Sequence, residues 1–366
     1  MVTRPAMSMI GMLVSAMARS KLFGQLLHAA RHSRLGNNGQ RHRKKRKIDI
    51  MMKTSDGVVI VREDVCRDVV NDRDAFVAVE GVFAAMAVGD AVNFPVVREA
   101  IGHADALYGF KSGFDRAGMA LGVKSGGYWP QNMANAGISN HQSSVFLFDP
   151  DTGRLQAIIG GNYLTAVRTA AAAAVSISHL ARPNASVLGM MGAGHQSVFQ
   201  LLAALQQRQF SKILGWNRST EALSRLAKLA DEYAIPFEAV TPDAMTQADV
   251  IVTITSSHQP LLMADQVSPG THLVCMGTDT KGKQEIDPAL FSVGTCFTDE
   301  VAQSVTIGEA QHAIAAGLVA EGAIVPIGNV INKDHAGRTS DDEITIFDGT
   351  SALVCRIWRW RQWPMR

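Results

Sequence analysis

The sequence predicts an α/β protein built on a doubly wound parallel sheet, and two observations in the second half of the chain indicate this fold class. Residues 186–191 form an apolar strand, and apolar residues then recur at helical spacing over residues 198–205. A glycine-rich turn, Gly192-Ala193-Gly194, joins this strand to this helix. Strands that alternate with helices in this way assemble into one parallel sheet with helices on both faces.

The following segments repeat the alternation. Residues 212–216 are predicted as a second strand, and residues 221–233 as a second amphipathic helix. Further strands are predicted over residues 237–240, 249–255 and 271–276. The complete second strand–helix unit matters because a G-x-G turn alone is weak evidence of a binding site.

The turn itself has the chemistry of a phosphate site. Gly192 permits the tight turn out of the strand, and Gly194 lets the backbone approach a pyrophosphate at the N-terminus of the next helix. Ser197 replaces the third glycine of the usual motif. We therefore predict a Rossmann-type domain that binds NADH or NADPH.

The end of the second predicted strand bears on the choice of cofactor. NAD-specific sites usually carry an acidic residue there, but this chain has Asn217, Arg218 and Ser219, with no acid before Glu221. Arg218 and Ser219 could hold a 2′-phosphate, which slightly favours NADPH. In the alternative interpretation Ser219 or Thr220 caps the next helix and Arg218 is solvated.

Length and composition exclude several classes of protein. The chain has 366 residues, enough for two domains, and it contains no apolar run of 18 residues that would suggest a membrane span. Its four cysteines are scattered without a C-x-x-C pair, which fits a reducing compartment, so we expect a cytoplasmic protein. No H-E-x-x-H motif occurs, and no metal site is predicted.

The two ends differ in composition from the rest. Residues 1–50 hold 11 Lys/Arg and one acidic residue, and residues 351–366 hold four Arg, three Trp and no acid. The basic leader, residues 1–55, is expected to be disordered. It could target an organelle, or it could bind nucleic acid or an anionic membrane. We favour a third interpretation, in which translation starts at Met51 or Met52 and the leader lies upstream of the start. The Arg/Trp tail could be a membrane-surface peptide or an aberrant end. Neither end supports a nucleic-acid or membrane partner.

Three motifs resemble those of the ornithine cyclodeaminase/mu-crystallin family. They are residues 164–171 (LTAVRTAA) followed by the glycine turn, residues 276–279 (MGTD) with Lys283, Glu285 and Asp287, and residues 348–350 (DGT). The resemblance spans about residues 70–350 and ends at Thr350, where the tail departs from the family pattern. Residues 93–99, 126–130 and 138–142 look most like the iminosuccinate reductases of this family, which make L-aspartate from iminosuccinate.

The resemblance implies a homodimer with a discontinuous α+β substrate and dimerisation domain. This domain would comprise residues 56–167 and a return at 323–350, around a dinucleotide domain at 168–322. Arg98, Lys124 and Arg168 would face the substrate carboxylate, and Asp279 would lie near the substrate nitrogen. The motif positions and the turn chemistry give these expected cofactor contacts: Thr169, Gly192, Ala193, Gly194, His195, Gln196, Asn217, Arg218, Ser219, Thr255, Ser256, Met276 and Gly277.

Imine reduction needs cations for the carboxylate and an acid near the nitrogen, and each candidate has a structural alternative. Arg168 begins an alanine-rich helix where it has no packing role, but it could be a surface residue. Lys124 lies in an apolar stretch and could be solvated, whereas Arg98 could make a structural ion pair. Asp279 could relay a proton or cap a turn, and His141 could bind substrate or be structural.

Reduction of a small imino acid, with iminosuccinate as the leading substrate, is the favoured function, with Lys124 and Asp279 as the catalytic residues. A dicarboxylate accounts for the many candidate cations, which include Lys111. One alternative is ornithine cyclodeamination, which uses bound NAD without net turnover. Others are a non-catalytic NADPH-binding protein and a chain that fails to fold because of its divergent end.

Overall fold

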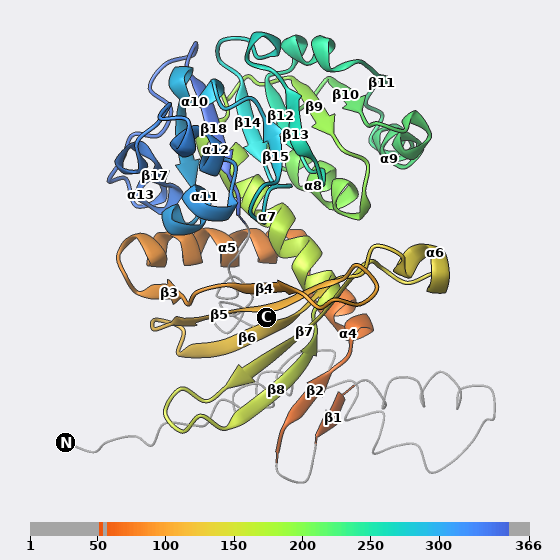
Figure 1. Ribbon diagram of the computed structural model, residues 1–366, viewed down its shortest axis with the longest axis vertical. Helices are drawn as coiled ribbons and strands as arrows, with labels where there is room; N and C mark the ends of the chain where they lie inside the picture. Colours follow the sequence, from red (N-terminus) through yellow and green to blue (C-terminus); the bar gives the residue numbers. More distant parts are fainter. Residues whose placement is uncertain (1–50, 54–56, 351–366) are drawn as a thin grey trace, which may run out of the picture.

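The computed structural model describes residues 51–53 and 57–350, which form two eight-stranded sheets with helices between and around them (Figure 1). The predictions for residues 1–50 and for the tail at 351–366 lie outside the described residues. One part of the predicted disordered leader is ordered: β1 (Met51–Lys53) pairs with β2 (Val59–Val61) in antiparallel register.

The upper sheet in Figure 1 is the predicted doubly wound parallel sheet. Its order is β11-β10-β9-β12-β14-β18-β16-β17, and every pair in it is parallel. The predicted strands between residues 186 and 276 are confirmed to within about two residues at each end. The strands are β9 (Val187–Met191), β10 (Lys212–Trp216), β11 (Phe237–Ala239), β12 (Val250–Thr253), β14 (His272–Cys275), β16 (Gly294–Thr298), β17 (Val325–Pro326) and β18 (Ile344–Asp348).

Both predicted helices of this domain are present. The first is α8 (His195–Leu205), and the second is divided into a 3₁₀ turn, η1 (Thr220–Leu223), and α9 (Ser224–Glu232). The remaining elements are η2 (Pro242–Gln247), η3 (Ala264–Gln266), α10 (Leu290–Val293), α11 (Val301–Ile307), α12 (Ala310–Ala315), η4 (Glu321–Ala323), α13 (Ile327–Ile331), and the separate parallel pair β13 (His258–Leu262) and β15 (Gln284–Ile286).

The lower sheet is mainly antiparallel and has the order β1-β2-β8-β7-β6-β5-β3, with β4 also paired to β5. Helices α4 and α5 pack with it, which gives the expected α+β architecture (Figure 1). Its remaining elements are α4 (Glu63–Val69), α5 (Asp72–Ala87), β3 (Ala91–Asn93), β4 (Val97–Ala100), β5 (Leu107–Asp115), β6 (Ala120–Tyr128), α6 (Asn132–Ala136), β7 (His141–Phe148) and β8 (Leu155–Gly160).

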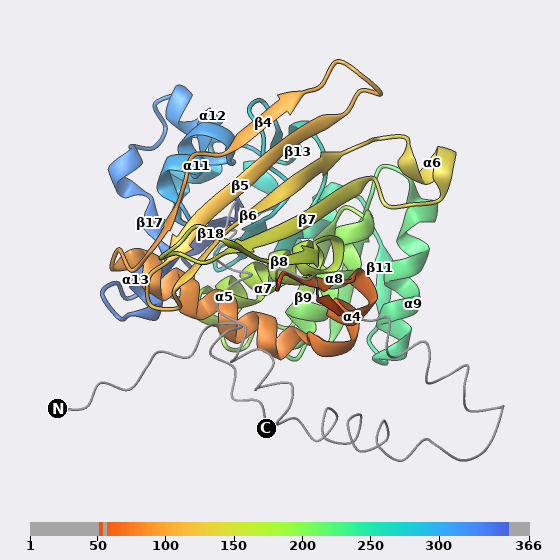
Figure 2. The ribbon, with the colours of Figure 1, turned by 90° about the horizontal axis from the view of Figure 1, so that it is seen from below.

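The two faces of the lower sheet have different environments. Along β5, Lys111 and Asp115 are buried on one face, whereas Tyr108 and Phe110 on the other face are each 42% exposed. This period of two is that of a strand with one covered face. Figure 2 shows β5, β6 and β7 in front of the helices, with no described helix lying over them.

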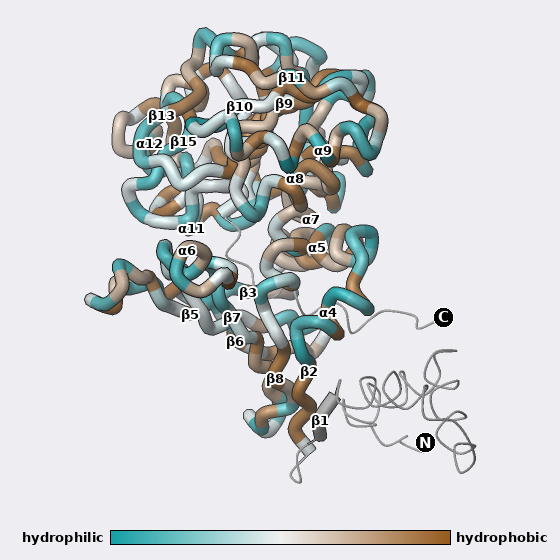
Figure 3. The backbone as a smooth tube through the Cα atoms, turned by 90° about the vertical axis from the view of Figure 1, so that its right-hand side faces the viewer, coloured by the Kyte–Doolittle hydropathy of each residue, from teal (hydrophilic) through white to brown (hydrophobic). Residues whose placement is uncertain are grey.

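Helix α7 (Asn162–Leu180) lies between the two sheets and contacts α5, α8, β7 and β14 (Figure 3). Most of its 19 residues are buried, so it is buried on all sides rather than along one stripe. Its alanines favour the helix and permit close approach of the neighbouring helices. The prediction that this helix begins at Arg168 is wrong, because it begins at Asn162, and the predicted domain boundary falls inside it.

The C-terminal part of the described chain corrects a second prediction. Residues 323–350 were expected to return to the substrate domain, but β17 and β18 lie in the dinucleotide sheet. The five residues of β18 are all buried and pair on both sides, with β14 and β16, as is typical of a central parallel strand. Of this segment, α13 and Asn332 adjoin α5: the Asn332 side chain donates to the Ala84 carbonyl at 2.9 Å.

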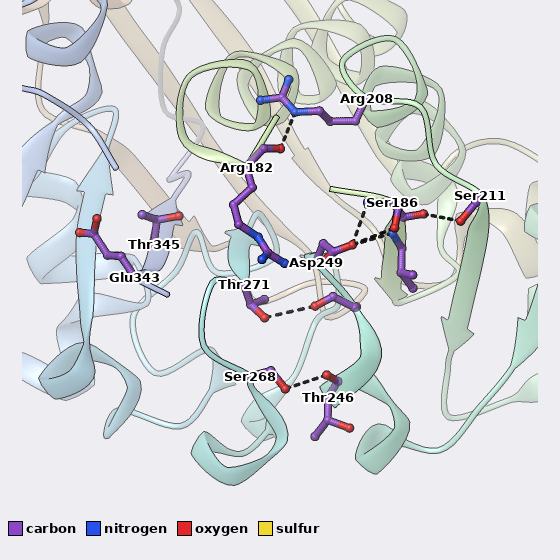
Figure 4. Close-up of polar contacts among 12 residues, drawn as sticks. Arg182, Ser186, Arg208, Ser211, Thr246, Asp249, Ser268, Thr271, Glu343 and Thr345 are labelled. Carbon is purple, nitrogen blue, oxygen red and sulfur yellow. Dashed lines mark hydrogen bonds and ion pairs between the residues drawn. The ribbon is translucent and has the colours of Figure 1, made fainter. Parts of the chain in front are cut away.

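A polar network ties together the starts of the dinucleotide strands, at the edge opposite the glycine turn (Figure 4). The Asp249 carboxylate accepts hydrogen bonds from the Ser186 and Val187 amides at 2.7 and 2.9 Å and pairs with Arg182 at 2.5 Å. Burial opposes ionisation of Asp249, but these partners hold its pKa below the usual value. The network fixes β12 against β9 and leaves the other edge of the sheet for binding.

Candidate active site

Apart from Thr169, which lies in α7, the predicted cofactor residues follow the ends of the parallel strands β9, β10, β12 and β14. Ligands of open α/β sheets bind at this edge. The loop after β14 also reaches the substrate sheet, because Asp279 pairs there with Arg98 of β4 at 2.5 Å. No helix of the described chain is both long and apolar enough to cross a membrane.

The glycine turn has the geometry that the sequence predicts. Gly192 has φ of +111°, and a Cβ atom on it would lie 2.5 Å from the Ile254 carbonyl oxygen. A Cβ atom on Gly194 would meet no atom within 4 Å, so the space beside the first turn of α8 is open. Ser197, at the third glycine position, is buried and donates to the Gly194 carbonyl at 2.7 Å. Serine is therefore accommodated without loss of the turn.

Asn217 links this turn to the end of the second strand. Its side-chain oxygen accepts from the Ala193 amide at 3.1 Å, and its side-chain nitrogen donates to the Ser219 carbonyl at 2.8 Å. Arg218 and Ser219 are exposed beside it. The alternative that Ser219 caps the following helix through its side chain is wrong, because no such hydrogen bond forms.

Glu285 and Glu309 hold the two loops that carry Thr255, Met276 and Gly277. The buried Glu285 carboxylate accepts from the Thr255 amide at 2.5 Å and the Gly277 amide at 2.8 Å. Glu309 accepts from the Thr278 hydroxyl at 2.5 Å and the Glu285 amide at 2.6 Å. The amides of Thr255 and Gly277 are thus already hydrogen-bonded, and these residues can reach a ligand only through other atoms.

Sequence reasoning missed Glu309 and gave Glu285 no role beyond its place in a motif. Burial and the charge of Glu285 raise the pKa of Glu309 well above the usual value, and burial raises the pKa of Glu285. Glu309 is the one acidic residue between positions 301 and 320 of the sequence, which was the available signal. Its partner Thr278 lies 31 positions away, and no local pattern indicates that contact.

The edge of the sheet where β9, β10, β12 and β14 end fits a nucleotide in two further respects. Among the described residues, the Gln196 side-chain oxygen is buried without a hydrogen-bond partner. His195 and Gly194 are exposed at the N-terminus of the 11-residue helix α8, where free amides favour an anion. Ser256 is exposed after β12, whereas the buried Thr169 hydroxyl donates to the Thr165 carbonyl within α7 at 2.7 Å.

Arg168 and Lys124 are buried basic side chains. Arg168 in α7 is 4% exposed and Lys124 in β6 is 8% exposed, so the surface alternatives for both are wrong. Burial lowers the pKa of Arg168 to about 10, and the guanidinium remains charged at neutral pH. Burial, together with the charges of Arg168 and Lys111, lowers the pKa of Lys124 well below the usual value for lysine.

Asp279 is paired with cations from both parts of the site. Its carboxylate lies 2.5 Å from Arg98 Nη1 and 2.9 Å from Lys283 Nζ. Burial opposes its ionisation, but the charges of Lys283, Arg98 and Lys111 hold its pKa well below the usual value. The alternative reading of Arg98, an ion pair, is thus observed, although that pair joins two candidate site residues.

His141 lies in the same cluster as a neutral residue. Burial, and then the charges of Lys124 and Arg168, lower its pKa to about 2. Its ring Nε2 lies 3.2 Å from the Ser143 hydroxyl. His141 can therefore exchange hydrogen bonds with a substrate but adds no positive charge. The described residues contain no cluster of His, Cys, Asp and Glu side chains suited to a metal ion.

A model of the ornithine cyclodeaminase/mu-crystallin family matches residues 56–354. The chain belongs to this family. Among curated members it is 58% identical over 294 residues to the iminosuccinate reductase of Paracoccus denitrificans (strain Pd 1222), covering 80% of this chain and 91% of the relative. It is 30% identical over 303 residues to the alanine dehydrogenase of Archaeoglobus fulgidus, covering 81% and 91%.

Solved structures of family members superimpose over most of the described chain. The Paracoccus denitrificans iminosuccinate reductase in complex with NAD⁺ has a TM-score of 0.78 at 57% identity, covering 82% of this chain and 93% of the other. An archaeal alanine dehydrogenase dimer with bound NAD has a TM-score of 0.77 at 27% identity, covering 83% and 95%. The family assignment made from the three motifs is thus confirmed.

Proposed function

We propose that this protein reduces iminosuccinate to L-aspartate, with NADH or NADPH as the hydride donor. The observation that carries the proposal is the charge of the site. Asp279 pairs with Arg98 and Lys283, and the buried basic side chains of Lys124 and Arg168 belong to the same electrostatic cluster. A site in which several basic side chains gather suits an anionic substrate such as a dicarboxylate. The 58% identity to the Paracoccus iminosuccinate reductase supports the same substrate.

Each site residue then has a role in the reaction. Iminosuccinate, NAD(P)H and a proton give aspartate and NAD(P)⁺, and the bound nicotinamide supplies the hydride. Arg168 and Arg98 orient the carboxylate next to the imine through charge-assisted hydrogen bonds. Asp279 stabilises the protonated imine nitrogen, and Lys124, whose pKa is lowered, supplies a proton.

Ornithine cyclodeamination is less compatible with this charge distribution. Ornithine carries a net positive charge, whereas the iminosuccinate dianion is negative. The site gathers Arg98, Lys283 and Arg168 around the Asp279 carboxylate, which favours the anion. The nucleotide-binding interpretation without turnover differs from both enzymes, because it predicts no product.

The test is NADH and NADPH oxidation by the purified full chain in the presence of oxaloacetate and concentrated ammonia, which generate iminosuccinate. Rapid oxidation with L-aspartate as the product supports the proposal and ranks the cofactors. Pyruvate with ammonia, and ornithine with NAD⁺, serve as controls. Proline formation from ornithine without net NADH consumption, or nucleotide binding without any product, would overturn it.

The lowered pKa of Lys124 predicts a pH dependence. A lysine is charged below its pKa, so kcat/KM falls as the pH rises through a value well below that of an ordinary lysine. Lys124→Arg keeps the positive charge at every pH tested. We therefore expect the ratio of wild-type to variant kcat/KM to fall as the pH rises through the pKa of Lys124. A ratio independent of pH would contradict the role of Lys124. The ratio also cancels the pH dependence of imine formation.

We also propose that the protein is a homodimer that uses the open face of the lower sheet. Tyr108 and Phe110 are exposed there, and Val123 and Phe146 on the same face are only half-buried. An exposed apolar sheet face of this kind marks an association surface. We expect wild type to sediment as a dimer and Phe110→Glu to sediment mainly as a monomer. A monomeric wild type at micromolar concentration would contradict the proposal.

We place this activity in the cytoplasm. Cys66, Cys275 and Cys296 are buried free thiols, and burial raises the pKa of each, which suits a reducing compartment.

A further inference from the structure

The loop that carries Asp279 is held at both ends by α12 and by Glu309, the residue before this helix. At the start of the loop, the Thr278 hydroxyl donates to Glu309 Oε1 at 2.5 Å. At its end, the Gly282 amide donates to the Gln311 side-chain oxygen at 2.8 Å. The position of Asp279 therefore depends on contacts that the start of α12 makes with both ends of its loop.

Glu309 is one of three carboxyl groups that are buried together, the others being Glu285 and Asp348. Each of the three side chains is at most 1% exposed. Glu309 Oε1 accepts from the Glu285 amide at 2.6 Å. The neighbours of Glu309 in the chain pack against Asp348, which accepts from the Ala310 amide at 3.2 Å and lies 2.5 Å from where a Cβ atom on Gly308 would be. Like charges that share a buried site repel, so this arrangement favours a proton on one of the three groups.

The hydrogen bonds indicate which group keeps the proton. Glu285 accepts from the Thr253 hydroxyl at 2.7 Å and from two backbone amides at 2.5 and 2.8 Å, which favours its charged form. Both short contacts of Glu309 fall on Oε1, whereas Oε2 lies 3.5 Å from the Ile286 nitrogen. Oε2 can therefore carry a proton without loss of a short hydrogen bond.

The titratable groups beside Glu309 are consistent with this assignment. They are Glu285 on β15, Asp348 on β18 and the Cys275 thiol on β14. Burial raises the pKa of Asp348 to about 6, so this group is mainly ionised at pH 7. Burial raises the pKa of Glu309 well above its usual value, and the charges of Glu285 and Asp348 raise it further. Burial also raises the pKa of Cys275, which keeps the thiol neutral.

We propose that Glu309 keeps its proton at neutral pH and, as a neutral side chain, is the positioning residue of the Asp279 loop. A neutral Glu309 can accept from Thr278 and from the Glu285 amide without repelling the Glu285 carboxylate. Glu285 then remains the anion that holds the Gly277 amide, at the other end of the link to Asp279. The part of this inference that concerns catalysis rests on the proposed function.

The first test measures kcat for iminosuccinate reduction. Glu309→Ala removes the acceptor of the Thr278 hydroxyl, and we expect kcat to fall about 10- to 100-fold, because a misplacement of about 1 Å can cost that much. Glu309→Gln keeps an acceptor oxygen without a charge and should recover most of the loss. Thr278→Val should lower kcat to a similar extent, and the combined Glu309→Ala/Thr278→Val variant should be no worse than Glu309→Ala alone. Glu321→Ala, at an exposed position of η4, is the matched control.

The second test measures the protonation of Glu309 without use of activity. The infrared spectrum in D₂O at pH 7 should contain the band of a protonated carboxyl group in wild type, and this band should be lost in Glu309→Gln. A carboxyl group whose pKa is raised on folding stabilises the folded state at low pH, and this contribution is lost as the pH rises through the raised pKa. The Tm of Glu309→Gln relative to wild type should therefore increase as the pH rises.

Each part of the proposal can fail separately. An unchanged carboxyl band in Glu309→Gln, or a relative Tm that falls as the pH rises, would overturn the protonated state. A kcat within 3-fold of wild type in a folded Thr278→Val or Glu309→Ala protein would overturn the positioning role. A wild type that shows the band but reduces no iminosuccinate would instead refute the proposed function, so the failures are distinguishable.

Discussion

Replacing Arg168 by methionine is expected to lower kcat/KM for iminosuccinate by about 10³-fold. Truncating one partner of a buried charge pair costs about 2–5 kcal/mol, and 10³-fold corresponds to about 4 kcal/mol. Arg168 is buried in α7 between the two sheets. The measurement is steady-state NADH oxidation with oxaloacetate and ammonia.

The activity of Arg168→Met must be compared with controls for folding and for charge. The Kd for NADH should change less than 3-fold, because Arg168 is assigned to the substrate and not to the nucleotide. Arg154→Met, in the exposed turn before β8, should retain wild-type activity. Arg168→Lys should recover only part of the loss, because an ammonium cannot make the bidentate contact. A loss below 10-fold in a folded Arg168→Met protein would refute the anchoring role.

Asp279→Asn should produce the second large effect, a fall in kcat of about 10²- to 10⁴-fold, which is the range for loss of a positioned acid–base group. Asparagine keeps the size of the side chain but cannot stabilise a positive charge on the substrate nitrogen. It also leaves Arg98 and Lys283 without their shared anion. We expect this variant to bind NADH normally.

Asp231→Asn, at an exposed position of α9, is the matched control and should retain wild-type kcat. Deuterated NADH distinguishes a chemical defect from slow product release, because the isotope effect on kcat should increase in Asp279→Asn if hydride transfer becomes rate-limiting. A kcat within 5-fold of wild type would show that Asp279 acts only as a structural partner of Arg98.

Local patterns predicted the dinucleotide half of the protein well. The strand at residues 212–216 has the predicted ends, and the turn at Gly192 has the positive φ that its glycine indicates. These features depend on residues that are close in the sequence. The candidate cations Arg98, Lys124 and Arg168 were identified by motif, and the structure places them near Asp279, as their mutual effects on pKa indicate.

Features that depend on distant contacts could not be predicted in this way. Residues 344–348 have an obvious strand pattern, but the pattern does not reveal that β14, about 70 residues earlier, is their partner. The position of β18 was therefore assigned to the wrong sheet. The start of α7 at Asn162 was missed for a related reason: Glu63, 99 positions earlier, accepts from the Asn162 amide.

The most direct test of the central claim is transfer of deuterium from NADH deuterated at both C4 positions, with oxaloacetate and ammonia as the source of iminosuccinate. Hydride reduction of the imine predicts L-aspartate that carries one deuterium at C2, with one NADH consumed for each aspartate formed. L-Aspartate without deuterium at C2, or no aspartate from a folded protein that binds NADH, would contradict the account.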